Sequence, residues 1–330
     1  MLEVREKILN TVRKYNLIQN DDVIVVGVSG GPDSVCLLDN LIALKETLKI
    51  KEIVVAHLNH QIREEAEEET LYVKEYCKNH EISCFVKYAK ILEISKEEKI
   101  GTEEAGRKER YKFFEEVASK VNANKIAIAH NLNDNAETVL MHLIRGSGIS
   151  GLCGIMPYRE GKIIRPLIKC ERTQIEKYCE ENKLYPKFDK SNNDNTYTRN
   201  KVRNELIPYI KKNINPNIIE TIDRLSELVT DEENYMNDVT ANAYQEILIE
   251  EKDKTIVLNL KKFNELEQVI KSRTILLTVQ KLFGTTKHIE KKHIDDIIKL
   301  CENNIGNKYL TPNKNTKIVV NHGKMYINKI

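Results

Sequence analysis

The chain has 330 residues, of which 41% are hydrophobic and 31% charged, an ordinary globular balance with enough length for two domains. Its formal net charge is only +2, so a polyanionic partner would need a local basic surface. The seven cysteines include no C-x-x-C pair, no apolar run could span a bilayer, and the first residues lack a signal-peptide core. We therefore expect a cytoplasmic protein with no membrane partner.

The first part of the chain alternates apolar, β-branched runs with amphipathic helical patterns. Strands are expected at 23–28, 53–56, 84–86 and 125–129, with helices beginning at residue 32 and spanning about 64–80 and 103–121. This alternation predicts an α/β fold with a doubly wound, mainly parallel Rossmann-like sheet and helices on both faces. We assign residues 1–212 to this domain.

The pattern changes beyond about residue 208. Helical periodicity dominates 217–248, 261–282 and 289–303, and short strand-like pieces follow at 317–320 and 325–327. Residues 213–330 are therefore predicted to form a smaller, mainly helical domain with a small β element at its end. Its lysines, at 261–262, 291–292 and between 308 and 324, could contact nucleic-acid phosphates, although scattered lysines usually form only a solvated surface.

The strongest local signal joins the first strand to the first helix: Ser29-Gly30-Gly31-Pro32-Asp33-Ser34. The glycines let a phosphate approach the main chain, and proline fits the first helical position, where free N–H groups point at an anion. Asp33 would be repelled by a bare phosphate, so we expect it to bind Mg²⁺ that bridges phosphates. The lysine of a Walker loop and the spacing of a dinucleotide fingerprint are both absent. An ordinary Gly-Pro turn is the structural alternative.

This loop resembles the mark of the PP-loop, or N-type ATP-pyrophosphatase, superfamily, SGGxDS after the first strand. Members split ATP between the α and β phosphates, release pyrophosphate and leave an adenylated substrate. The resemblance implies a PP-loop ATPase type of fold, ATP bound on Ser29–Ser34, and Mg²⁺ as cofactor.

Five further segments narrow the resemblance: 57–63, 105–114, 129–138, 145–152 and 189–208. In order and spacing they resemble the tRNA(Ile)-lysidine synthetase family, densely over residues 20–210. That resemblance implies an ATP-dependent ligase that joins free lysine to C2 of the wobble cytidine of tRNA(Ile) with a CAU anticodon. An adenylated cytidine would be the intermediate, with AMP and pyrophosphate as products. The oligomeric state stays open, a homodimer included.

Asp134 and Glu137 stand three residues apart, so at a helix start they share a face that can hold a cationic amine or a metal. The resemblance assigns the pair to the lysine substrate, with Asp134 also serving Mg²⁺. The structural alternative is a helix cap with Asn133 or Asp134 as the capping residue. Asn131 and Asn133 depart from the family's usual A-H-H-x-D-D-x-x-E-T, and we infer that Asp134 is the essential acid.

Several basic residues complete the expected site. Arg110 is expected to be catalytic and to bind phosphate or the lysine carboxylate, Arg203 to bind lysine, and His130 to act as a general base or proton shuttle. Contacts to tRNA phosphates are assigned to His60, Arg63, Arg145 and Arg199. A lone arginine is more often a surface charge and a lone histidine a structural residue, which are the alternatives for these positions.

Three other functions fit parts of the pattern. A PP-loop tRNA thiolase of the 2-thiocytidine type would normally carry paired cysteines, which are missing. An adenylating amide-forming ligase would need an ammonia source. A non-catalytic nucleotide-binding module would bind ATP without releasing pyrophosphate.

Overall fold

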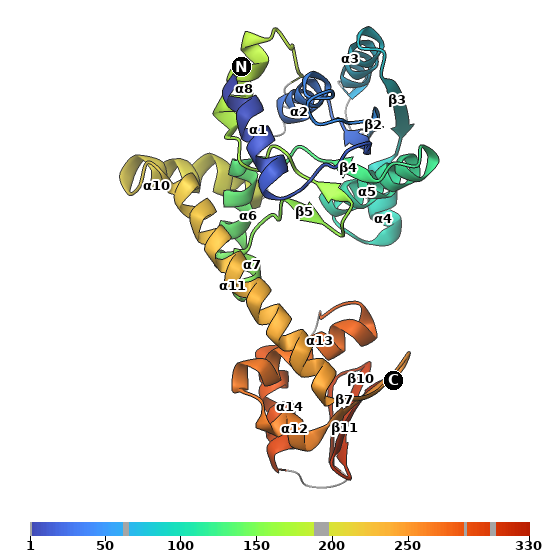
Figure 1. Ribbon diagram of the computed structural model, residues 1–330, viewed down its shortest axis with the longest axis vertical. Coiled ribbons are helices and arrows are strands. Elements are labelled where there is room, and N and C mark those ends of the chain that lie inside the picture. Colours follow the sequence, from blue (N-terminus) through green and yellow to red (C-terminus); the bar gives the residue numbers. More distant parts are fainter. Residues whose placement is uncertain (1, 62–65, 188–197, 287–288, 304–307) are drawn as a thin grey trace. The chain divides into compact units, whose positions relative to one another are not determined.

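The computed structural model describes residues 2–61, 66–187, 198–286, 289–303 and 308–330 (Figure 1). The chain divides into two compact units, Met1–Thr230 and Asp231–Ile330. The division falls within one long helix, α11 (Ile218–Ile247).

The first unit is built on a six-stranded sheet in the order β3-β2-β1-β4-β6-β5. Its strands are β1 (Val23–Gly27), β2 (Glu52–Asn59), β3 (Ser83–Tyr88), β4 (Lys125–Ala127), β5 (Tyr158–Arg159) and β6 (Ile163–Ile164). Every pair is parallel except β5 with β6. This sheet confirms the predicted doubly wound, mainly parallel α/β fold.

Helices cover both faces of this sheet (Figure 1). In the described part of this unit, the helices that precede α11 are α1 (Leu2–Lys14), α2 (Pro32–Ala43), α3 (Ala66–Asn79), α4 (Ile91–Glu98), α5 (Thr102–Lys120), α6 (Leu132–Ile144), α7 (Ile149–Leu152), α8 (Arg172–Glu181), α9 (Thr198–Lys201), the π-helical turn η2 (Val202–Leu206) and α10 (Ile207–Asn213). Because strand side chains alternate, Ile24 and Val26 join one core with α1, α2 and α8, while Val23 and Val25 join a second core with α5. Burial on both faces explains why the first strand is a continuous apolar run.

The end of β1 is closely covered by α5. A Cβ atom placed on Gly27 would lie 2.4 Å from Cζ of Phe114, so only glycine leaves room for that ring. The contact brings α5 against the strand immediately before the glycine-rich loop, which helps to fix where that loop begins.

The second unit contains α12 (Leu260–Glu265), α13 (Gln268–Phe283) and α14 (Lys291–Asn303). The single helix predicted over 261–282 is divided into α12 and α13, whereas the helix predicted over 289–303 matches α14 within two residues. Its sheet is larger than the small terminal element expected. Five antiparallel strands follow the order β7-β8-β11-β10-β9: β7 (Leu248–Lys252), β8 (Thr255–Asn259), β9 (Lys308–Asn313), β10 (Thr316–Asn321) and β11 (Lys324–Lys329). β7 escaped prediction because four of its five residues are exposed, so this edge strand carries no apolar alternation.

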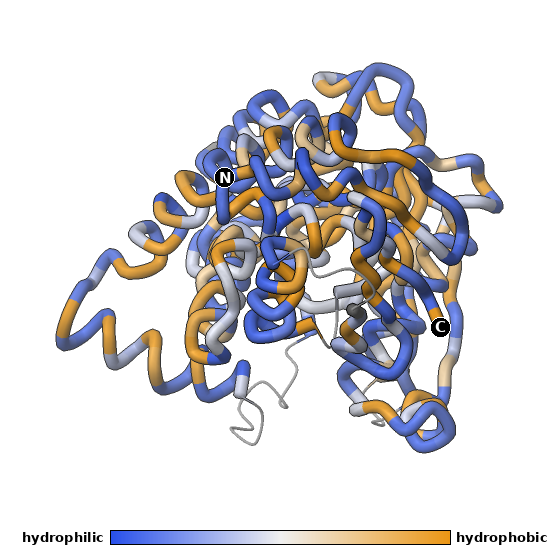
Figure 2. The backbone as a smooth tube through the Cα atoms, turned by 90° about the horizontal axis from the view of Figure 1, so that it is seen from below, coloured by the Kyte–Doolittle hydropathy of each residue, from blue (hydrophilic) through white to orange (hydrophobic). Residues whose placement is uncertain are grey.

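The helices of the chain are amphipathic rather than apolar all round. Figure 2 shows hydrophilic and hydrophobic segments alternating along the helical turns of the tube. None of the helices within the described ranges combines the length and apolar character needed to cross a membrane.

Candidate active site

The candidate site lies at the edge of the first sheet where its parallel strands end. The segments that leave β2, β1, β4 and β6 at this edge begin near His60, Ser29, His130 and Arg165, respectively. In sheets of this kind, ligands bind beyond the carboxyl ends of the strands. The fold therefore gathers at one edge four segments that are far apart in the sequence.

The glycine-rich loop is shaped by its own serines. Gly30 has φ +93°, a left-handed conformation that favours glycine. The Ser29 amide donates to Ser34 Oγ at 3.1 Å, and Ser34 Oγ donates to the Gly31 carbonyl at 3.0 Å. Gly31 is the N-cap of α2 and makes no side-chain cap, so the first-turn N–H groups stay directed toward an incoming anion. This is the geometry that a phosphate-binding loop requires.

Asp33 lies in the first turn of α2 and is poorly compensated. Among the described residues its hydrogen-bond partner is a single neutral group, Asn131 Nδ2, which donates to Asp33 Oδ1 at 2.9 Å. Burial and the nearby charge of Asp134 raise the pKa of Asp33 to about 6. A cation bound at this carboxyl would favour its charged form and so counteract both effects on the pKa.

The start of α6 is capped by Asn131, not by Asn133 or Asp134. Asn131 Oδ1 accepts from the Asp134 amide at 3.0 Å, and Asp134 Oδ2 accepts from the Asn131 amide at 3.1 Å, which forms a capping box. Asn133 Oδ1 accepts from the backbone amide of Arg172 at 3.0 Å. Both departures from the family motif therefore make defined hydrogen bonds, and Asn131 also bridges Asp33 and Asp134.

The carboxylates of α6 lie inside a group of arginines, which we call the α6 charge cluster: Asp134, Glu137, Arg172, Arg199 and Arg203. Glu137 is only 1% exposed; it accepts from Arg199 Nε at 2.8 Å and from Arg203 Nε at 2.6 Å. Asp134 Oδ1 accepts from Arg199 Nη2 at 3.0 Å and from Arg203 Nη2 at 3.2 Å. Arg199, which the sequence assigned to a tRNA phosphate, thus pairs with the carboxylates that it assigned to lysine, and so does Arg203, which it also assigned to lysine.

Arg172 joins this cluster and was missed by sequence reasoning. Its Nη2 lies 3.5 Å from Asp134 Oδ1 and 3.7 Å from Glu137 Oε1. It is the first residue of α8, where a positive charge is unfavourable for the helix dipole. That same signal was available in the sequence and would have pointed to an acidic partner.

The remaining predicted residues do not all lie at this edge, because Arg145 follows the end of α6 that is opposite Asp134. Arg110 Nη2 donates to His60 Nε2 at 3.1 Å, so these two predicted residues meet each other. His130 Nδ1 accepts from Nε of Arg165 at 2.9 Å. Arg145 is exposed just after α6, and Arg63 lies outside the described residues.

The donor set near the loop suits a hard divalent cation. Asp33 and Asp134 carry carboxylates and are linked through Asn131, and Mg²⁺ is commonly held by one or two carboxylates plus substrate phosphates. Within the described ranges, no group of three or more His, Cys, Asp or Glu side chains could hold a metal without such additional ligands.

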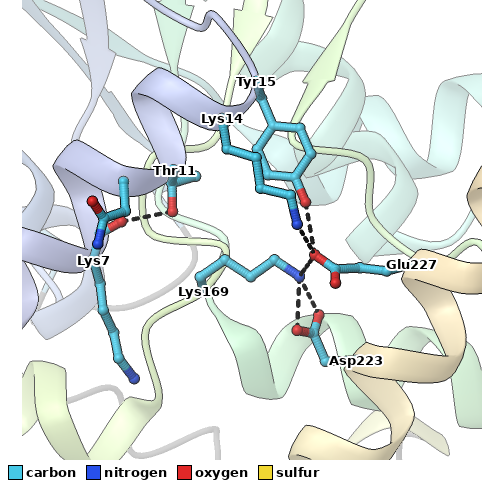
Figure 3. A pocket seen from close by; sticks show the side chains of 8 residues that line it. Lys7, Thr11, Lys14, Tyr15, Lys169, Asp223 and Glu227 are labelled. Atoms are coloured by element: carbon cyan, nitrogen blue, oxygen red, sulfur yellow. Dashed lines mark hydrogen bonds and ion pairs between the residues drawn. The ribbon is translucent and has the colours of Figure 1, made fainter.

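A separate pocket on the first unit is lined by charged residues of α1 and the start of α11 (Figure 3). Glu227 Oε1 lies 2.8 Å from the Nζ atoms of Lys14 and Lys169 and accepts from the Tyr15 hydroxyl at 2.8 Å. Lys169 Nζ also lies 2.7 Å from Asp223 Oδ2. With a volume of about 220 Å³, the pocket is smaller than typical ligand sites, and its charges are already paired. We call this group the α1–α11 network and assign it a structural role.

The fold and the loop define the class of protein. Residues 2–210 match the PP-loop domain family. Among solved structures, the fold of this chain is similar to that of the U34-tRNA thiolase NcsA from Methanococcus maripaludis, with a TM-score of 0.58 and 20% identity over 69% of this chain and 79% of that one. At this identity the likeness shows the fold alone.

Curated relatives define the family more closely. The chain is 44% identical to a tRNA(Ile)-lysidine synthase of Clostridioides difficile, over 94% of this chain and 67% of the relative. It is also 44% identical to that of Clostridium acetobutylicum, over 96% and 68%, and 38% identical to that of Caldanaerobacter subterraneus, over 93% and 65%. The chain belongs to the tRNA(Ile)-lysidine synthase family, an enzyme family of carbon–nitrogen ligases. This confirms the resemblance noted in the sequence and leaves the thiolase as a distant structural neighbour.

Proposed function

We propose that the chain joins free lysine to C2 of the wobble cytidine of tRNA(Ile) with a CAU anticodon, at the expense of ATP. The observation that carries this proposal is the placement of the phosphate-shaped loop and the α6 charge cluster at one edge of the sheet, bridged by Asn131. One part suits nucleotide phosphates and the other suits an amino acid.

The first step adenylates the cytidine. The ATP phosphates lie against Ser29–Ser34, and the cytosine C2 oxygen attacks the α-phosphate while pyrophosphate leaves. Mg²⁺, held by Asp33 and Asp134, would offset negative charge on the phosphates. The chain's own donors on the loop and on α2 then hold the phosphates in line and stabilise the charge that develops there.

The second step transfers lysine. The α6 charge cluster offers both halves of an amino-acid site: carboxylates for an ammonium group and guanidinium groups for a carboxylate. Lysine can enter only by exchanging partners, with its ammonium on Asp134 or Glu137 and its carboxylate on Arg203, or on Arg110 from α5. The amine loses a proton and attacks C2, and AMP departs with the electron pair of the broken C–O bond.

Contacts to the tRNA backbone are proposed for His60, Arg63 and Arg145 and for the lysine-rich second domain, where Lys261 and Lys292 are exposed. Arg199, which the sequence assigned to a phosphate, forms ion pairs within the α6 charge cluster in the ligand-free chain. A cytoplasmic location is part of the proposal, because all seven cysteines are free thiols.

The test is pyrophosphate release with ATP and Mg²⁺, measured with and without tRNA(Ile) bearing CAU and with and without lysine, followed by mass analysis of the wobble nucleotide. We expect release to require the tRNA, and the cytidine to gain the mass of lysine minus water only when lysine is present. A matched transcript with uridine at the wobble position should give neither product. Pyrophosphate release without the mass gain would contradict the substrate assignment.

A further inference from the structure

The residue after β6, Arg165, is a buried cation for which neither the sequence analysis nor the proposed chemistry has yet given a role. It is only 4% exposed. Its Nη1 donates to the Met156 carbonyl at 2.5 Å, and its backbone amide donates to the Pro157 carbonyl at 2.8 Å. Within the described part of the chain it forms no ion pair with a carboxylate. Its side chain also hydrogen-bonds with Tyr111, and its Nε donor points at His130.

The strand register explains why His130 lies beside the phosphate-binding loop. Val26 of β1 pairs with Ala127 of β4, so Ser29 and His130 each lie three residues beyond this pair on neighbouring strands. Ala127 in turn pairs with Ile164, the residue before Arg165. The histidine thus stands between the loop on one side and Arg165 on the other.

The contact between the two side chains fixes the protonation of the ring. Arginine has only donors and keeps its charge in proteins, so His130 Nδ1 must be the acceptor of the 2.9 Å hydrogen bond. A neutral ring with a lone pair on Nδ1 carries its proton on Nε2. The half-buried ring therefore presents an N–H group, not a lone pair, from its other nitrogen.

The surroundings keep the ring neutral. Burial, together with the positive charges of Arg165, Arg107, Arg199 and Arg110, lowers the pKa of His130 well below its ordinary value. These cations come from three separate segments: α5, the residue after β6, and α9. An uncharged imidazole is a poor proton acceptor here but a good hydrogen-bond donor to an anionic oxygen.

We propose that Arg165 is a positioning residue that holds His130 as a neutral Nε2–H donor, and that His130 donates this hydrogen bond to an oxygen of the phosphate under attack. The ligand is thus an anionic phosphate oxygen, whose charge grows in the transition state. The proposal rests on the proposed function for the identity of that phosphate. It excludes His130 as the base that accepts the proton of the lysine amine.

The tautomer can be read directly by nitrogen-15 NMR of histidine-labelled full-length protein, with the His130 resonances assigned by their loss in His130→Gln. We expect a protonated Nε2 and an unprotonated Nδ1 from about pH 5 to about pH 8, without titration. In Arg165→Gln the donor that fixes the tautomer is lost, so part of the ring population should carry its proton on Nδ1. An Nδ1–H tautomer, or a ring that titrates near its ordinary pKa of about 6.5, would overturn the proposal.

Kinetics separate a donor from a base. The amide of His130→Gln can occupy the position of Nε2 and donate, whereas the amide of His130→Asn reaches only the position of Nδ1. We expect His130→Gln to keep at least tenfold more pyrophosphate release than His130→Asn, because about a hundredfold or more depends on such a donor. Equal loss in both variants would contradict the donor role.

Arg165→Gln should lower kcat for pyrophosphate release by about 100-fold, with KM for ATP changed by less than about threefold, because the donor is misplaced while the loop is intact. Lys162→Gln is the matched control: it removes a positive charge from the residue just before β6, where Lys162 pairs with Glu115, and should leave kcat unchanged. If Arg165→Gln fails to fold, the proposal is still tested by the tautomer of His130 in the wild-type protein and by pyrophosphate release in the two His130 variants. The tautomer is read without substrate, so absence of lysidine would overturn only the proposed function.

Discussion

Two carboxyl groups of the first unit, Asp33 and Glu227, show opposite ways of placing an acid in a protein. Asp33 lies in the phosphate-binding loop with one neutral donor, and burial and the charge of Asp134 raise its pKa to about 6. Glu227 lies in the α1–α11 network (Figure 3). There, burial alone would raise its pKa, but hydrogen bonds from Lys14, Lys169 and Tyr15 outweigh it and hold the pKa at about 2.

This difference in partners distinguishes a structural carboxylate, Glu227, from one that we propose to bind a ligand, Asp33. The chain supplies every partner that Glu227 needs, so its charge stabilises the folded state. The chain leaves Asp33 short of a cation, and the folded state bears that cost until a ligand arrives. The α6 charge cluster lies between these extremes, because its partners are present but can be exchanged for those of lysine.

The largest effect is expected from Asp33→Asn. Pyrophosphate release should fall by about a thousandfold, because the carboxylate proposed to hold Mg²⁺ is lost. The ligand-free variant should nevertheless be more stable, by roughly 3 kcal/mol above pH 6, because the pKa rises from 3.8 to about 6 and each pKa unit corresponds to about 1.4 kcal/mol. The folded-state pKa of this acid is raised, so its charge destabilises the fold once the pH exceeds the unfolded pKa. The gain should vanish below about pH 4.

Urea titrations of the wild type and of Asp33→Asn at several pH values measure this difference in the free energy of unfolding. Ser34→Ala, which keeps the carboxyl, serves as a control and should show no such pH-dependent gain. Equal stabilities of the wild type and Asp33→Asn at pH 8 would show that the charge of the loop carboxyl does not destabilise the folded state.

Glu137→Gln should impair lysine transfer and leave adenylation of the cytidine nearly unchanged. This buried side chain belongs to the α6 charge cluster, and removing one charge of a buried pair costs about 2–5 kcal/mol, or about 30-fold or more in binding. We expect lysine transfer to fall by that factor while tRNA-dependent pyrophosphate release changes by less than about threefold. Single-turnover reactions with varied lysine separate the two steps, and thermal unfolding checks the fold. An equal loss in both steps would place Glu137 outside the lysine site.

A smaller effect is expected from Glu227→Gln, which should leave both steps unchanged and lower the free energy of unfolding by about 1 kcal/mol at pH 7. Because the folded pKa lies near 2, this stabilisation is present above the unfolded pKa of about 4.5 and is lost as the pH falls toward 2. Denaturant titrations between these pH values test the slope. Glu75→Gln, an exposed change on α3, is the control, and any loss of activity in Glu227→Gln would contradict a purely structural role.

Much of this architecture can be predicted from local sequence patterns. β1 and β2 are β-branched runs buried on both faces, and the loop between β1 and α2 consists of residues with strong backbone preferences. β7 could not be foreseen, because an exposed edge strand such as Leu248–Lys252 has no apolar periodicity.

Some site residues can likewise be predicted from a local sequence pattern, and others cannot. Asp134 and Glu137 stand at a helical spacing that signals a shared face, but the arginines around them come from two distant segments: α8 carries Arg172, and the contiguous α9 and η2 carry Arg199 and Arg203. Arg165 is a single residue after a two-residue strand, and only the pairing of β4 with β6 brings it to His130. Contacts of this kind depend on sheet order, which local sequence does not encode.

The claim that the loop carboxyl awaits a cation is tested most directly by carbon-13 NMR of Asp33 during a pH titration, first in the ligand-free protein and then with Mg²⁺ and a non-hydrolysable ATP analogue. The account predicts a pKa of about 6 without ligands and a fall below the ordinary value of about 3.9 when both are bound. An ordinary pKa in the ligand-free protein, or a pKa near 6 that the ligands leave unchanged, would contradict it.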